Sequence, residues 1–121
     1  MKKIELNRGK GKTHRCLKRA LKLVKKGGNV IYITPYGMGH ADDLSLDFKD
    51  MIYGKISYHF LPGKGNRFKF PKGNFIKFVS WEYYHEHTGQ EFYDRSLNII
   101  FDDIDILFVG TLDTVSITKG F

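Results

Sequence analysis

The order of apolar and polar positions predicts an alternation of strands and helices in the first third of the chain. Residues 3–6 suit a short strand, and residues 13–26 carry apolar side chains at helical spacing, i, i+3, i+4 and i+7, beneath a cationic outer face. Two lysines followed by two glycines at 25–28 predict the end of this helix. The run VIYITP at 30–35 is continuously apolar, as in a strand that is buried on both faces. Strand, glycine loop, helix and strand together predict a βαβ unit.

The middle of the chain predicts a second helix and a hairpin. Residues 40–54 have a helical apolar side, with Asp42 or Asp43 near the expected start. Residues 55–60 then read as a strand. Two alternating runs at 67–79 surround the turn sequence Pro-Lys-Gly-Asn, which predicts a β-hairpin.

The last third of the chain adds further strands. After an ambiguous aromatic stretch at 81–96, the run at 97–109 begins as a buried strand that ends in acids, and residues 113–121 supply a last short strand. No linker, repeat or low-complexity segment interrupts the sequence, so we expect residues 1–121 to form a single domain. The alternating elements predict an α/β domain of three layers, with a largely parallel central sheet and a β-hairpin insertion.

Composition and charge narrow the function classes. Hydrophobic residues make up 41% of the 121 residues, which is enough for a core, and no run of eighteen apolar residues is present. With Cys16 as the one cysteine, we expect a cytoplasmic protein that has no membrane partner. The net charge of +7 is uneven, because residues 1–28 hold eleven Lys and Arg against the single acid Glu5. This predicts that the basic N-terminal helix binds a polyanion such as DNA, although a solvated helix face has the same composition.

The stretch LNRGKGKTHR at 6–15 carries the first candidate chemistry. In the Walker A phosphate loop, G-x-x-x-x-G-K-S/T, backbone N–H groups surround the phosphates, the lysine contacts them and the hydroxyl binds magnesium. Gly11, Lys12 and Thr13 match the end of this pattern, whereas Leu6 stands in place of the first glycine. Because the loop lies between a predicted strand and a predicted helix, we expect it to bind a nucleotide phosphate, with a basic surface turn as the alternative. The candidate nucleotide-binding residues are Arg8, Gly9, Lys10, Gly11, Lys12, Thr13 and His14.

The acidic end of a later strand supplies the second element of a nucleotide site. In NIIFDDID the apolar run ends at Asp102 and Asp103. A magnesium–nucleotide site needs an acid at the end of a buried strand, so Thr13 and Asp102 are the candidate metal ligands. Asp103 is the candidate catalytic residue that orients or deprotonates the attacking water. The alternative is a strand that ends in a solvated acidic turn.

Four segments together resemble a known family. The sequences NRGKGKT, NVIYITP, FKFPKGNFIKFVS and NIIFDDID are similar to the ATPase core of the large terminase subunit of tailed phages, the motor that drives DNA into capsids. That family commonly uses R-x-x-G-K-S/T, which residues 8–13 match, and a hairpin of the form F-P-x-G-x-x-I-x-F before its acidic strand. The resemblance covers about residues 4–105 and implies a minimal P-loop NTPase-like domain without a nuclease domain.

The resemblance also implies roles for individual residues. Lys12 and Thr13 would bind phosphates and magnesium, Asp102 would be the magnesium acid, and Arg8 would act in catalysis as an arginine finger within the chain. The family has glutamate after the magnesium acid, whereas this chain has the shorter Asp103, so we expect slow ATP hydrolysis.

The sequence thus predicts an ATP- and Mg²⁺-binding protein of phage or mobile-element type that acts on or near DNA. If it is encoded by a phage, it would work in the host cell cytoplasm. Whether it turns ATP over is left open, and so are assembly into a homo-oligomer and pairing with another phage protein. The rival interpretation is a degenerate, non-catalytic terminase-like module that binds nucleic acid or a protein partner.

Overall fold

The computed structural model describes residues 11–87, 96–102, 106–111 and 118–119, and side chains for 13–87 and 96–102. Helices and strands alternate in the first part of the chain, and strands predominate in the last. In chain order the elements are α1 (Gly11–Lys25), β1 (Asn29–Thr34), α2 (Met38–Ile52), β2 (His59–Leu61), β3 (Arg67–Lys69), β4 (Phe75–Ser80), α3 (Trp81–Glu86), β5 (Leu97–Asp102), β6 (Ile106–Thr111) and β7 (Thr118–Lys119). The protein is therefore of the mixed α/β class.

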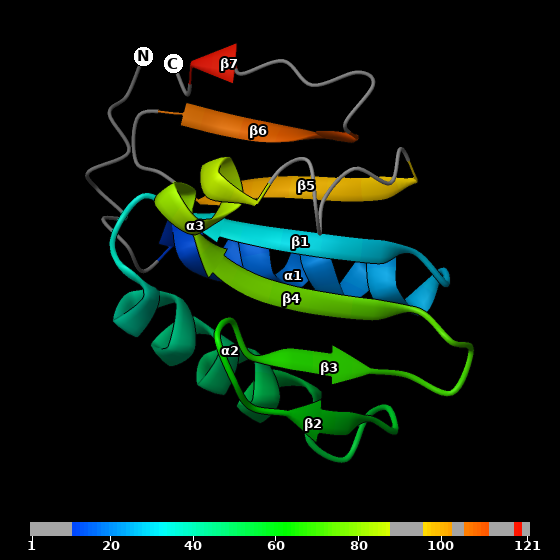
Figure 1. Ribbon diagram of the computed structural model, residues 1–121. Coiled ribbons are helices and arrows are strands. Elements are labelled where there is room, and N and C mark those ends of the chain that lie inside the picture. Colours follow the sequence, from blue (N-terminus) through cyan, green and yellow to red (C-terminus); the bar gives the residue numbers. More distant parts are fainter. Residues whose placement is uncertain (1–10, 88–95, 103–105, 112–117, 120–121) are drawn as a thin grey trace.

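The described strands form one mixed sheet in the order β2-β3-β4-β1-β5-β6-β7 (Figure 1). Only the centre is parallel, where β1 pairs with β4 and with β5. The pairings β2–β3, β3–β4, β5–β6 and β6–β7 are antiparallel. The expectation of a largely parallel sheet is thus wrong for the sheet as a whole.

Connection length explains this difference. A parallel neighbour requires a crossover of a dozen or more residues, whereas a short turn can only return the chain antiparallel. Five residues join β3 to β4, and three join β5 to β6, so both connections produce antiparallel neighbours. The predicted hairpin at 67–79 is confirmed as β3–β4, and its second strand is a central strand of the sheet rather than an insertion.

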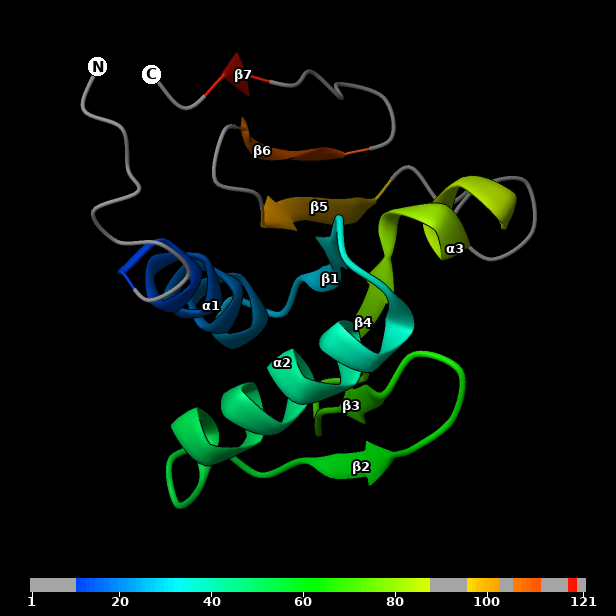
Figure 2. The ribbon, with the colours of Figure 1, turned by 90° about the vertical axis from the view of Figure 1, so that its left-hand side faces the viewer.

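Helices cover both faces of the sheet. Figures 1 and 2 show α1 and α2 together on one face and the short α3 on the other. Both α1 and α2 run opposite in direction to the three parallel strands (Figure 1), because α1 leads into the start of β1 and α2 follows the end of β1. The start of α1 therefore lies at the carboxyl end of the parallel strands, and its C-terminus lies at their amino end.

Two apolar clusters hold these layers together. On the side of α1 and α2, the rings of Phe48, Phe68 and Phe78 lie with centroids 5.5–6.1 Å apart and are fully buried. On the side of α3, Trp81 packs against Phe101 with centroids 5.1 Å apart. Strand residues contribute alternately to the two clusters, because successive side chains of a strand point to opposite faces.

Element boundaries differ from the sequence prediction in places. Helix α1 matches the predicted helix, and β1 matches the predicted buried strand. Helix α2 begins earlier than expected, after Gly37, with no side-chain cap, so the placement of Asp42 or Asp43 near its start is wrong. The strand predicted at 55–60 is limited to β2 and begins at His59. The strand predicted at 3–6 lies outside the described residues. None of the described helices is both long and apolar enough to cross a bilayer.

Candidate functional site

The structure brings together two predicted site residues that are far apart in the sequence. Asp102 is the last residue of β5, and its side chain is 6% exposed. Thr13 lies in the first turn of α1, which begins at the same end of the sheet. The Thr13 hydroxyl donates a hydrogen bond of 3.4 Å to Oδ1 of Asp102. The Thr13 hydroxyl and the Asp102 carboxylate therefore lie next to each other beside the start of α1.

Tyr32 is a further member of this cluster. Its hydroxyl donates a 2.7 Å hydrogen bond to Oδ2 of Asp102, and its side chain is 1% exposed. Burial, and then the negative charge of Asp102, raise the pKa of the Tyr32 hydroxyl well above its ordinary value of 10.0. The Tyr32 hydroxyl therefore keeps its proton at physiological pH and acts as a hydrogen-bond donor to one carboxylate oxygen of Asp102. Thr13 contacts the other oxygen.

The register of the sheet explains why Tyr32 meets Asp102. Tyr32 of β1 is level with Ile100 of β5, and Asp102 lies two residues further on. Side chains two residues apart on a strand point to the same face, so Ile100 and Asp102 both face α1. The long phenol spans the remaining distance along the strand direction. Sequence reasoning missed this contact, although a tyrosine inside a buried strand signals that its hydroxyl needs a partner.

The start of α1 adds the means to bind an anion. The first backbone N–H groups of an α-helix have no partner within the helix, and the helix dipole places positive charge there. The first turn of α1 holds no acidic residue. The amides of Gly11, Lys12 and Thr13 thus belong to a helix start that favours a phosphate group, at the same end of the sheet as Asp102.

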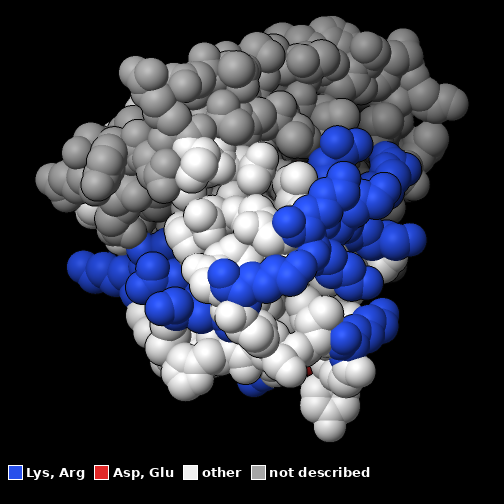
Figure 3. All heavy atoms as spheres, turned by 90° about the vertical axis from the view of Figure 1, so that its right-hand side faces the viewer, with Lys and Arg blue, Asp and Glu red and all other residues white. Residues whose placement is uncertain are grey.

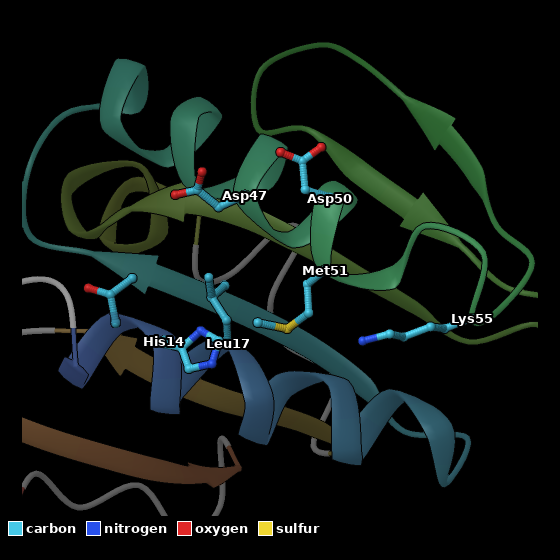
Figure 4. Close-up of a pocket in the computed structure, with 7 residues that line it drawn as sticks. His14, Leu17, Asp47, Asp50, Met51 and Lys55 are labelled. Carbon is cyan, nitrogen blue, oxygen red and sulfur yellow. The ribbon is translucent and has the colours of Figure 1, made fainter.

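A groove of about 530 Å³ runs beside this point, between α1 and α2. Figure 4 shows its lining, with His14 and Leu17 on α1 and with Met51 extending from α2 toward α1. Asp47 and Asp50 of α2 also line the groove. Lys55 lines the groove as well, so the charges along it are mixed, whereas the first turn of α1 holds no acidic residue.

The remaining predicted residues are only partly placed. Gly11 and Lys12 begin α1, but the Lys12 side chain is not among those described, and His14 is exposed on the first turn. Arg8, Gly9, Lys10 and Asp103 lie outside the described residues. The predicted phosphate loop and the predicted water-orienting acid thus stay predictions, whereas Thr13 and Asp102 are seen to lie together.

The donor set at this point suits a magnesium ion. Mg²⁺ prefers oxygen ligands and retains several waters, so it is commonly held by one or two protein oxygens together with substrate phosphates. Thr13 and Asp102 supply a hydroxyl and a carboxylate within hydrogen-bond distance. Among the described residues no group of three or more His, Cys, Asp or Glu side chains could form a metal site made of protein ligands alone. A metal ion held by Thr13 and Asp102 would complete its coordination with water or with a substrate phosphate.

Comparison with protein-family models, with curated proteins and with solved structures gave no significant match. The functional argument therefore depends on the chain's own residues, their geometry and the motifs that they form.

Proposed function

We propose that this protein binds ATP together with Mg²⁺ at the start of α1 and hydrolyses it slowly. The observation that carries the proposal is the Thr13–Asp102 contact of 3.4 Å. A Gly-Lys-Thr sequence at a helix start and an acid at the end of a buried strand are the two elements that a phosphate loop and its magnesium acid require. They lie 89 residues apart in the chain and adjacent in space.

Each residue has a defined task in this proposal. The amides at the start of α1 and the Lys12 ammonium bind the phosphates, because both offer positive charge to an anion. Thr13 and Asp102 would hold Mg²⁺, which supplies charge neutralisation between the phosphates. Tyr32 fixes the orientation of Asp102 by occupying one of its two oxygens.

Slow turnover follows from the residue after Asp102. Asp103 stands where terminase-like ATPases have glutamate, and it is one methylene shorter. A displacement near 1 Å of a catalytic group costs on the order of a hundredfold in rate. Arg8 would stabilise charge on the transferred phosphoryl group as an arginine finger.

The nucleic-acid part of the proposal concerns α1. Its outward side carries exposed or partly exposed basic residues and no acid; these are Arg15, Lys18, Arg19, Lys22 and Lys25. Clustered cations of this kind bind phosphodiester backbones through release of counterions. We propose that DNA lies against this helix, as expected for a protein of phage or mobile-element type that resembles a packaging ATPase.

A non-catalytic binding module is the second candidate. It is favoured by the Tyr32 hydrogen bond, because Asp102 already has donors at both of its oxygens, which is a stable arrangement without any metal. In this case the Thr13–Asp102–Tyr32 cluster fastens α1 to the sheet, and the module binds nucleic acid or a protein partner without turnover.

Titration calorimetry with ATP and Mg²⁺ tests the proposal. Lys12→Ala should weaken ATP binding by at least about tenfold, roughly 1.4 kcal/mol. Lys18→Ala is the matched control, since it removes the same charge from an exposed position on the same helix and should leave ATP affinity nearly unchanged. Absence of binding by the parent protein, or equal affinities of parent and Lys12→Ala, contradicts the proposal. A phosphate-release assay on the same samples separates the ATPase from the binding module.

A further inference from the structure

Lysines from three separate segments lie at the end of the sheet opposite Thr13 and Asp102. Helices α1 and α2 both end there, β1 begins there, and the β3–β4 turn lies there (Figures 1 and 2). The five exposed lysines of this surface, which we call the lysine end, are Lys25, Lys26, Lys55, Lys69 and Lys72. Figure 3 views this side of the molecule and shows Lys and Arg atoms across it, with acidic atoms almost absent.

The charge of the lysine end is not neutralised within the described part of the chain. The Lys72 ammonium donates a 3.3 Å hydrogen bond to the backbone oxygen of Lys25, at the C-terminus of α1. This contact satisfies a helix carbonyl but provides no carboxylate for either lysine. Lys25 and Lys72 line the same cavity, so their positive charges favour an anion there.

The anchor of this arrangement is Asn74. Its Nδ2 donates to the backbone oxygens of Val24, at 3.0 Å, and Gly28, at 2.9 Å. Its side chain is 4% exposed. The β3–β4 turn is thereby fastened to the end of α1, so the backbone positions of Lys25 and Lys72 are fixed relative to one another. The lysine end is a preorganised surface, which lowers the entropic cost of binding.

A cavity of about 300 Å³ opens between these lysines. Its lining is apolar beneath a cationic rim: Val24, Ile56, Phe70 and Pro71 provide the apolar part, and Lys25 and Lys72 flank it together with Ser57 and Asn74. A flat apolar group that is attached to a phosphate suits such a site. Nucleobases of a single strand are available for this contact, whereas those of a duplex are stacked and paired.

We propose that the lysine end binds single-stranded nucleic acid, with backbone phosphates on Lys25 and Lys72 and a base against the cavity between them. The inference deepens the nucleic-acid part of the proposed function by naming the surface and the strand state. It does not depend on ATP binding, because the nucleotide site lies at the other end of the sheet.

Fluorescence anisotropy with a labelled oligonucleotide of about 20 deoxythymidines, and with a duplex of equal length, tests the inference over a series of salt concentrations. The parent protein should bind the single strand more tightly. Lys25→Gln combined with Lys72→Gln removes two phosphate contacts, so the slope of log affinity against log salt should fall by about 1.4. Glutamine is a good helix former, so the substitution in α1 preserves the helix.

The matched control is Lys49→Gln combined with Lys64→Gln, which removes two lysine charges that belong neither to α1 nor to the lysine end. Its salt slope should stay near that of the parent. Equal slopes of the two double variants would show that the lysine end is not the binding surface. Equal or tighter binding of the duplex by the parent would show that the surface does not prefer a single strand. Absence of any binding by the parent overturns the inference altogether.

A third variant tests the cavity without altering charge. Ser57→Leu places an apolar side chain at the rim of the cavity and should reduce the preference for the single strand over the duplex by at least about threefold. An unchanged preference would show that the cavity is not part of the binding site. ATP titration of the Lys25→Gln/Lys72→Gln variant should match the parent, so a failure of this inference and a failure of the ATP proposal give different results.

Discussion

The hydroxyl of Tyr32 lies 2.7 Å from Oδ2 of Asp102 and donates a hydrogen bond to it across the β1–β5 pair. Both side chains are buried, at 1% and 6% exposure. The bond links β1 to β5 through Asp102, the residue proposed to hold magnesium. It should therefore affect both the stability of the fold and the candidate site.

Tyr32→Phe should destabilise the fold by about 1.5–3 kcal/mol, because the ring stays in place while a buried carboxylate loses a hydrogen-bond donor. Urea denaturation at neutral pH measures this difference. Tyr36→Phe is the control, since Tyr36 is 55% exposed and should change the free energy of unfolding by less than about 0.5 kcal/mol. Equal effects of the two substitutions would contradict an energetic role for the Tyr32–Asp102 bond.

The same residue predicts a pH dependence in the alkaline range. The pKa of Tyr32 is raised by burial, and then by Asp102, well above 10.0. Above about pH 10 the unfolded chain therefore loses the Tyr32 proton while the folded chain keeps it, so stability falls as pH rises, by up to about 1.4 kcal/mol per pH unit from this group. In Tyr32→Phe that part of the loss should disappear. Parallel pH profiles of parent and variant would show that the group does not titrate as inferred.

Asp103→Glu should raise the rate of ATP hydrolysis at saturating ATP and leave affinity nearly unchanged, because the longer acid alters transition-state geometry alone. Asp103→Asn should abolish the activity. Steady-state phosphate release measures both. A rate that neither change alters would assign the protein to the non-catalytic alternative, and fast hydrolysis by the parent would show that the shorter acid is already well placed.

Gly65→Ala should cost at least about 1 kcal/mol more than Gly54→Ala. Both glycines have positive φ, of 86° and 74°, so both substitutions strain the backbone. A methyl group at Gly65 would also lie 2.9 Å from Cγ1 of Val79 and 3.0 Å from the backbone oxygen of Phe78, whereas Gly54 is open. Thermal and urea unfolding of the two variants gives the comparison, and equal destabilisation would contradict the steric argument.

Local sequence was sufficient to predict those elements whose own spacing of apolar residues shows which side is buried. Helix α1 is apolar on one side at 3.6-residue spacing, and β1 is continuously apolar, so each was predictable without knowledge of its neighbours. The β3–β4 hairpin was predictable because its turn sequence and the alternation of its strands agree. The candidate residues Thr13 and Asp102 were also found from the sequence, since each stands at the end of a recognisable element.

Strand neighbours, and the contacts that depend on them, were decided by the tertiary structure. The pattern of β5 shows that it is buried, but it does not show that β6 returns beside it in the antiparallel direction, so the largely parallel sheet was an incorrect expectation. The Tyr32–Asp102 bond depends on the β1–β5 register, and a shift of one residue would turn Asp102 to the other face. The meeting of Lys25 and Lys72 likewise requires α1 to end where the β3–β4 turn lies, which is a matter of packing between segments distant in the chain.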